Sequence, residues 1–176
     1  MPTYDNRFIS LLVREGYCSI CQRDSRFGSG NDWLRDSYLC SHCRTIPRQR
    51  ATAEVLNLVQ RNWRNLQLHE SSPSIDFYAV QCAGYSRPYY LEGVPPGTRK
   101  DGELCQNLEY LTFADCSFDV FITQDVLEHV FNPDRAVREI MRVLKPRGVH
   151  VFTAPKHKHV LLSRRRARLI SWQSDR

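Results

Sequence analysis

The sequence lacks several features that mark large classes of proteins. No apolar run in its 176 residues approaches the roughly 20 that cross a bilayer, so no transmembrane helix is expected. The N-terminus, MPTYDNRFIS, has no apolar stretch behind basic residues, which counts against a secretory signal and favours a cytoplasmic location. The G-x-S-x-G, H-E-x-x-H and G-x-x-x-x-G-K-[ST] motifs are missing too, and this counts against hydrolase functions.

Excess positive charge is missing from most of the chain. The net charge is +6, and residues 156–176 carry seven Lys and Arg against one Asp. The rest of the sequence is therefore neutral, and a site for nucleic acid would have to lie in this basic tail or in a local patch. A solvated tail is the more common meaning of a run such as RRRAR.

Four of the seven cysteines form two tight pairs near the N-terminus. Cys18 and Cys21 lie in CSIC, Cys40 and Cys43 lie in CSHC, and 18 residues separate the pairs. Two such turns offer four thiolates, which Zn²⁺ takes as a closed tetrahedral shell in structural sites. The alternatives are two disulfides, which need an oxidising compartment, or four unrelated buried thiols. We therefore predict a structural zinc ribbon over residues 1–46, with His42 as a bystander.

The rest of the sequence predicts a linking helix and then alternating strands and helices. Pro47 suits the first turn of a helix that runs to about Trp63, with Val55, Leu58 and Val59 on its apolar side and its arginines on a solvated face. The expected domains are a linking helix over 47–65, an α/β domain over 66–155 and a basic C-terminal tail over 156–176.

Within the α/β region the predicted elements follow in a regular order. Strands are expected at 66–70, 85–93, 117–125 and 149–155, helical spacing starts at Ile75, residues 94–104 form a loop, and a helix begins at Asn132-Pro133 with an apolar stripe of Ala136, Val137, Ile140, Met141 and Leu144. Strand, helix, strand with short links indicates a parallel sheet. Ligands bind open α/β sheets at the carboxyl ends of the strands, where Glu70, Gln124 and Asp125 are expected.

The run NLEYLTFADCSFDVFITQDVLEHVFNPDRAVREIMRVLKPRGVHVFTAP resembles the second half of a class I S-adenosylmethionine (SAM)-dependent methyltransferase of the type 11-like group. The cysteine pairs followed by HESSP also resemble a bacterial subgroup in which a four-cysteine zinc module precedes this domain. The resemblance implies a Rossmann-like methyltransferase sheet, incomplete at about five parallel strands, because only 21 residues follow the fifth strand.

The resemblance also implies roles for individual residues. Glu70 would face the methionine amino group of SAM, Glu92 the ribose hydroxyls, and Asn107-Leu108 the adenine. The usual glycines after the first strand are replaced by Ser-Ser-Pro-Ser. The implied cofactor-binding residues are Glu70, Ser71, Ser72, Glu92, Asn107, Leu108, Gln124 and Asp125.

Each of these residues has a simpler alternative role. Glu70 would otherwise cap the next helix, Glu92 would be a loop carboxylate, and Asp125 would cap the turn that follows it. Asp125 and His129 are the candidates for a catalytic base, although a Glu-His pair at this place mostly orients the turn. Methyl transfer needs a base only when the acceptor must lose a proton.

Two functions from different classes fit the sequence. The first is a SAM-dependent methyltransferase acting on a small-molecule or glycan acceptor. The second is a non-catalytic zinc-ribbon protein that binds nucleic acid or a protein partner on a degenerate methyltransferase scaffold. An open edge beside the last strand would also favour oligomer formation.

Overall fold

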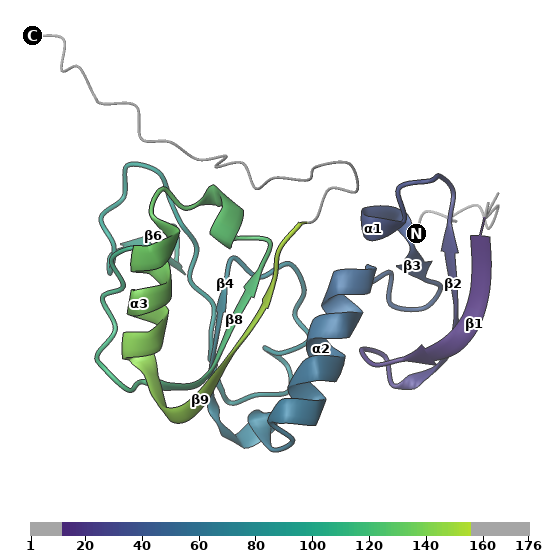
Figure 1. Ribbon diagram of the computed structural model, residues 1–176, viewed down its shortest axis with the longest axis horizontal. Coiled ribbons are helices and arrows are strands. Elements are labelled where there is room, and N and C mark those ends of the chain that lie inside the picture. Colours follow the sequence, from purple (N-terminus) through teal and green to yellow (C-terminus); the bar gives the residue numbers. More distant parts are fainter. Residues whose placement is uncertain (1–11, 156–176) are drawn as a thin grey trace, which may run out of the picture. The chain divides into compact units, whose positions relative to one another are not determined.

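A computed structural model describes residues 12–155 and divides the chain into two compact units, Met1–Val59 and Gln60–Arg176 (Figure 1). The predicted basic tail, residues 156–176, lies outside the described residues. No helix within residues 12–155 has the length and apolar character that a membrane crossing requires.

The first unit contains the antiparallel sheet β1-β2-β3. The strands are β1 (Leu12–Cys18), β2 (Arg23–Ser29) and β3 (Leu39–Cys40), and the short helix α1 (Leu34–Ser37) precedes β3. The sharp turn from β1 to β2 carries the first cysteine pair, and β3 leads into the second. The sheet therefore brings both pairs to one end of the unit.

Helix α2 (Pro47–Val59) begins at the proline, as predicted, but ends four residues before Trp63. The short helix η1 (Trp63–Asn65) follows. The predicted apolar side was wrong: Val55, Leu58 and Val59 are 43%, 69% and 52% exposed. The buried residues of α2 are Gln49, Thr52, Ala53 and Leu56.

Polar groups of α2 can be buried because the helix itself satisfies them. The Gln49 side chain accepts the backbone N–H of Ile46 at 2.9 Å, and the Thr52 hydroxyl donates to the Arg48 carbonyl at 2.8 Å. A stripe defined only by apolar residues misses such positions.

The second unit contains a four-stranded parallel sheet in the order β5-β4-β8-β9. The strands are β4 (Gln67–Ser71), β5 (Gly84–Ser86), β8 (Phe118–Gln124) and β9 (Leu144–Thr153). The described sheet thus has four strands rather than the expected five or so. Between β5 and β8 the described chain adds no strand to this sheet and makes one isolated parallel bridge, Tyr89 to Cys105. Strand β5 is an edge strand that stops before Pro88, as prolines require.

Two local predictions in this unit were wrong. The segment from Ile75 to Cys82 forms separate turns, closed by Val80 N–H to Asp76 and Cys82 N–H to Tyr78, and no continuous helix. The predicted loop 94–104 contains a hairpin of β6 (Arg99–Lys100) and β7 (Glu103–Leu104). Asp101 and Gly102 form its turn with φ of 52° and 84°, and Asp-Gly is a strong signal for such a two-residue turn.

Helix α3 (Pro133–Val143) starts as predicted, with the Asn132 side chain accepting the Arg135 N–H at 3.1 Å. Its buried residues are Ala136, Ile140 and Val143, so the apolar stripe was partly wrong: Val137 and Met141 are 39% and 68% exposed. The chain enters β9 directly at Leu144, five residues before the predicted strand at 149–155.

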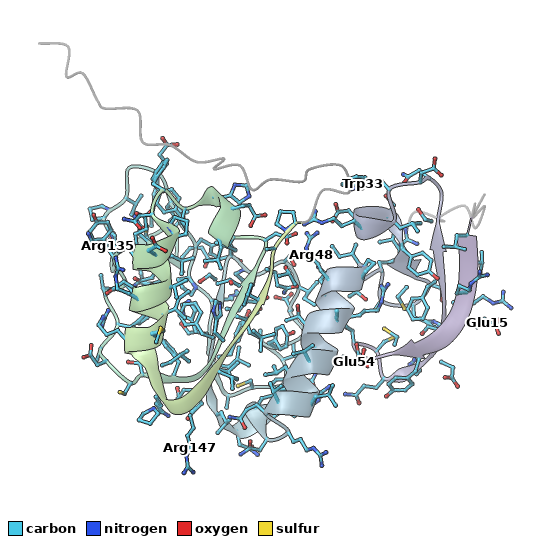
Figure 2. All side chains as sticks on the ribbon, in the orientation of Figure 1. Glu15, Trp33, Arg48, Glu54, Arg135 and Arg147 are labelled. Atoms are coloured by element: carbon cyan, nitrogen blue, oxygen red, sulfur yellow. The ribbon has the colours of Figure 1, made fainter. Side chains whose placement is uncertain are left out.

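One face of the parallel sheet packs against α3 (Figure 1). The core there combines residues of β8 and α3 with the loop before β8, and its buried members are Leu108, Leu111, Phe118, Phe121, Ala136, Ile140 and Val143. Arg142 fastens that loop by donating to the carbonyls of Leu111 and Phe113 at 2.8 and 2.9 Å. By contrast, Arg147, near the start of β9, extends outward (Figure 2).

Candidate functional site

The carboxyl ends of three neighbouring strands are joined by hydrogen bonds to one carboxylate. Glu70 of β4 accepts the Tyr85 hydroxyl of β5 on Oε2 at 2.7 Å and the Gln124 side-chain N–H of β8 on Oε1 at 2.9 Å. Glu70 is 1% exposed. The two residues are 15 and 54 positions from Glu70 in the sequence, so the sheet order alone brings them together.

The Glu70 carboxylate has no cationic partner among residues 12–155. Burial raises its pKa above the ordinary value, and the hydrogen bonds from Tyr85 and Gln124 only partly oppose that rise. Tyr78, which is fully buried nearby, has a hydroxyl that bonds to nothing in the described part of the chain. A buried carboxylate that lacks a countercharge fits a ligand that brings a cation.

The turn after β4 adopts glycine-like backbone geometry without glycine. Ser72 has φ of 52°, and its N–H donates to the Pro88 carbonyl at 3.1 Å. This is the left-handed region, which L side chains adopt at some cost. The Ser-Ser-Pro-Ser segment, which replaces the usual glycines, therefore makes a sharp turn, and the turn is anchored to the segment after β5.

On the face of the sheet opposite Glu70, two pairs of polar side chains lie within hydrogen-bond distance. His69 Nε2 lies 3.0 Å from the Ser71 hydroxyl, and His150 Nε2 lies 3.0 Å from the Thr123 hydroxyl. Burial lowers the pKa of His69 to about 3 and that of His150 to about 4. Both rings are therefore neutral at pH 7. Ser71, one of the predicted cofactor residues, points into this pair.

Asp125 and His129 differ sharply in their surroundings. Asp125 follows β8 with φ of 54°; its N–H donates to the Thr153 carbonyl at 3.1 Å, and its Oδ1 accepts the Thr153 hydroxyl at 3.0 Å. It thus links the ends of β8 and β9. His129 ends the short helix η2 (Leu127–His129), has a side chain that is 78% exposed, and lies 4.0 Å from Glu128.

The remaining predicted cofactor residues are Glu92, Asn107 and Leu108, which lie in the segment between β5 and β8. Glu92 is exposed in the segment after β5. Asn107 accepts the Glu109 N–H on Oδ1 at 2.9 Å, which leaves that oxygen one further lone pair. Leu108 is 7% exposed and belongs to the core under α3.

The four cysteines of the first unit form one cluster. Their sulfurs all lie within 4.8 Å of one another, and the separations are 3.7 Å for Cys18 to Cys43 and 3.8 Å for Cys21 to Cys40. Zn–S bonds of about 2.3 Å at tetrahedral angles place sulfurs about 3.8 Å apart. A disulfide needs about 2.0 Å, and all four thiols are free. The donor set and its spacing therefore fit Zn²⁺.

Both cysteine pairs have the same local geometry. Gln22 and Arg44, each following the second cysteine of a pair, have φ of 53° and 60° and donate their N–H to the first cysteine's carbonyl at 2.8 and 3.0 Å. The second sulfur of each pair also contacts a hydroxyl: Ser25 at 3.6 Å from Cys21 and Thr45 at 3.0 Å from Cys43. Such outer hydrogen bonds orient ligands in metal sites. The residues involved are Gln22, Ser25, Arg44 and Thr45.

The pKa values of the cluster thiols shift in different directions. Burial raises the pKa of Cys21 to about 12 and also raises that of Cys43. Burial acts in the same sense on Cys40, but backbone N–H groups of Cys43 and His42 outweigh it and lower the Cys40 pKa to about 6. Without a metal, Cys21 therefore holds its proton at pH 7, and burial favours the protonated form of Cys43 as well.

Arg50 is a structural residue of this unit that the sequence reasoning assigned to a solvated face. Its guanidinium lies 4.6 Å from the centre of the Phe27 ring and donates to the Tyr38 carbonyl at 3.0 Å. Burial lowers the pKa of the Arg50 guanidinium, and the nearby thiols of Cys18, Cys40 and Cys43 oppose that shift only in part. No pattern in the sequence near the start of α2 indicated this role for Arg50.

Comparisons with known proteins give a family model that matches part of the second unit. Residues 92–152 match the family model described as methyltransferase domain (Methyltransf_11). This segment, which includes β6 to β9 almost completely, is therefore part of a class I SAM-dependent methyltransferase domain, as the sequence predicted. A search of curated proteins gives no match.

Among solved structures, one similar chain is described as "Crystal Structure of the [4+2]-Cyclase SpnF". The two are 21% identical, with a TM-score of 0.39. The match covers 58% of this chain and 44% of that chain. This chain thus spans less than half the length of that relative.

Proposed function

We propose, from the methyltransferase-domain segment at residues 92–152, that this chain binds SAM at the carboxyl ends of β4, β5 and β8 and transfers its methyl group. The observation that carries the proposal is the buried Glu70 carboxylate, which has two neutral donors and no cationic partner in the described part of the chain. When bound, SAM supplies a methyl group already activated on a sulfonium cation. The chain's own residues then need only to bind, align and exclude water.

The residues near Glu70 support this assignment in different ways. Ser72 gives the tight turn beside the strand end, and Gln124 holds the carboxylate from the neighbouring strand. We propose Asn107 and Leu108 at the adenine and Glu92 at the ribose on the family resemblance. Asp125 and His129 are the proposed candidates for removing a proton, if the acceptor has one to lose.

We propose a small molecule or a glycan as the methyl acceptor. This class rests on the resemblance of the domain to its family, since no contact in the chain identifies the acceptor. Screening methyl transfer from labelled SAM to small alcohols, amines and sugars tests it. Transfer to none of them, with transfer to a protein or nucleic acid instead, would overturn this part of the proposal.

Calorimetric titration of the full chain with SAM tests the cofactor site. Glu70→Gln should weaken binding at least tenfold, because it removes the charge that pairs with the cation. Glu54→Gln, the same change at an exposed position of α2, should leave the affinity within about twofold. The proposal fails if the wild-type chain does not bind millimolar SAM, or if both variants bind equally well.

We further propose that Zn²⁺ occupies the cluster of Cys18, Cys21, Cys40 and Cys43 as a structural ion. Four thiolates fill a tetrahedral shell and leave no open position for chemistry. Purified chain should contain one zinc by elemental mass spectrometry. Cys43→Ser should reduce that content strongly, whereas Cys116→Ser, an exposed cysteine outside the cluster, should not change it. Equal zinc content in both variants would contradict the assignment.

A further inference from the structure

Two tyrosines lie beside the Glu70 carboxylate, and only one of them donates a hydrogen bond to it. The Tyr85 hydroxyl donates to Oε2 at 2.7 Å. The Tyr78 hydroxyl is fully buried and bonds to nothing within residues 12–155. The charge of Glu70 raises the pKa of both phenols, after the larger effect of burial, so both stay protonated at neutral pH.

The pairing of β4 with β5 places the Tyr85 side chain beside Glu70. Tyr85 is paired with Leu68 across β5 and β4, so its side chain lies on the same face as that of Glu70, two residues further along β4. Gln124 reaches the other oxygen from β8. The carboxylate is therefore held from both sides by neutral donors on neighbouring strands.

The charged and titratable groups around this contact are few. Tyr85 acts on Glu70 from β5, and β8 contributes the neutral Gln124. The charge of Glu70 in turn acts on Tyr78, in the turns at 75–82. Tyr89 and Arg87 act on Tyr85 in opposite directions. The hydrogen bonds from Tyr85 and Gln124 are thus the interactions that favour the ionised form of the buried Glu70 carboxyl.

We propose that Tyr85 is a positioning residue that holds Glu70 ionised and oriented, so that the carboxylate is ready for a cationic group of the cofactor. The inference rests on the proposed function and adds to it a residue that does not itself need to touch SAM. Tyr85→Phe removes only the hydroxyl, and a buried carboxylate that loses a short donor should take up a proton more easily.

The Glu70 titration tests this without any cofactor. In full-length chain labelled with ¹³C at glutamate side-chain carboxyls, Glu70→Gln identifies the Glu70 signal. Tyr85→Phe should raise the Glu70 pKa by about one pH unit, because a hydrogen bond to a charged group has about that effect. Tyr78→Phe is the matched control: it removes a hydroxyl without a partner and should change that pKa by a few tenths at most.

SAM binding then gives the functional readout. Tyr85→Phe should bind SAM about threefold more weakly than wild type at a pH midway between the two Glu70 pKa values and about tenfold more weakly below both of them. The difference should disappear as the pH rises above both pKa values. A purely structural role would weaken binding equally at every pH. Fluorotyrosine incorporated at position 85, a stronger donor with an intact ring, should lower the Glu70 pKa and serves as a second variant if Tyr85→Phe does not fold.

The possible outcomes separate the two proposals. An unchanged Glu70 pKa in Tyr85→Phe, or equal shifts in Tyr85→Phe and Tyr78→Phe, overturns the role of Tyr85. A wild-type chain that does not bind SAM overturns the proposed function, and the Glu70 titration then decides by itself whether Tyr85 keeps the carboxylate charged.

Discussion

His69 should make the second unit sensitive to acid. The ring is 0% exposed and lies among Phe113, Phe118 and Phe121, with centroid distances of 5.2, 5.0 and 4.1 Å. Nε2 faces the Ser71 hydroxyl at 3.0 Å, and Nδ1 has no partner among residues 12–155. Burial lowers the pKa of His69 to about 3, against about 6.5 in an unfolded chain.

The sign and size of the effect follow from proton linkage. Between pH 6.5 and 3 the unfolded chain binds a proton at His69 and the folded chain does not, so the neutral ring's contribution is present above pH 6.5 and is lost as the pH falls. Each unit below 6.5 costs about 1.4 kcal/mol, which gives about 2 kcal/mol at pH 5. His150, whose pKa is lowered to about 4, acts in the same direction.

Urea unfolding of the full chain between pH 8 and pH 5 measures this effect. His69→Phe keeps an aromatic ring in the cluster but loses the bond to Ser71, so it is less stable at pH 8 by about 1 kcal/mol. Its further loss between pH 8 and 5 should be about 2 kcal/mol smaller than that of wild type. His129→Gln, at an exposed position, should follow wild type. The reasoning is refuted if His69→Phe loses as much stability on acidification as wild type does.

Three further predictions concern metal and stability. Zinc binding should release protons at pH 7 and strengthen as the pH rises, because the Cys21 thiol, with a pKa of about 12, must lose its proton; calorimetry in buffers of different ionisation enthalpy measures this release. Gly84→Ala should destabilise the chain by about 1–3 kcal/mol in urea unfolding, since a Cβ would meet the Leu66 carbonyl at 2.5 Å, whereas Gly16→Ala, with its nearest neighbour at 3.6 Å, should have little effect. Asn132→Ala should cost about 1 kcal/mol in the same assay, because it removes the cap of α3; no loss would contradict that role.

The sequence predicted those features that depend on local chemistry. The start of α3 at Asn132-Pro133, the buried strand at 117–125 and the two cysteine pairs each need only residues close in sequence, and the structure confirms the elements and the sulfur cluster. The resemblance to methyltransferases likewise depended on a contiguous run, and the family match falls within it for most of its length.

The errors arose where burial did not follow apolar character. On α2, Gln49 and Thr52 are buried because the backbone satisfies their side chains, while Leu58 is exposed. On α3, Val143 is buried in the core, whereas Met141 is 68% exposed although it is apolar. A hydrophobic pattern gives the periodicity of a helix, but its tertiary contacts decide which side is buried.

The environment of Glu70 depends on contacts that no local pattern contains. Sequence reasoning placed Glu70 and Gln124 at strand ends, but it could not show that Gln124 donates to one carboxylate oxygen while Tyr85 donates to the other. That arrangement requires β4 to lie between β5 and β8, and strand order is a property of the whole sheet. Because the donors are neutral, burying the carboxylate leaves its charge uncompensated, and a ligand cation would supply the compensation. The lack of a cationic side chain at Glu70 among residues 12–155 is thus the feature on which the proposed binding of a positively charged cofactor rests, and the affinity of Glu70→Gln for SAM is the measurement that tests it.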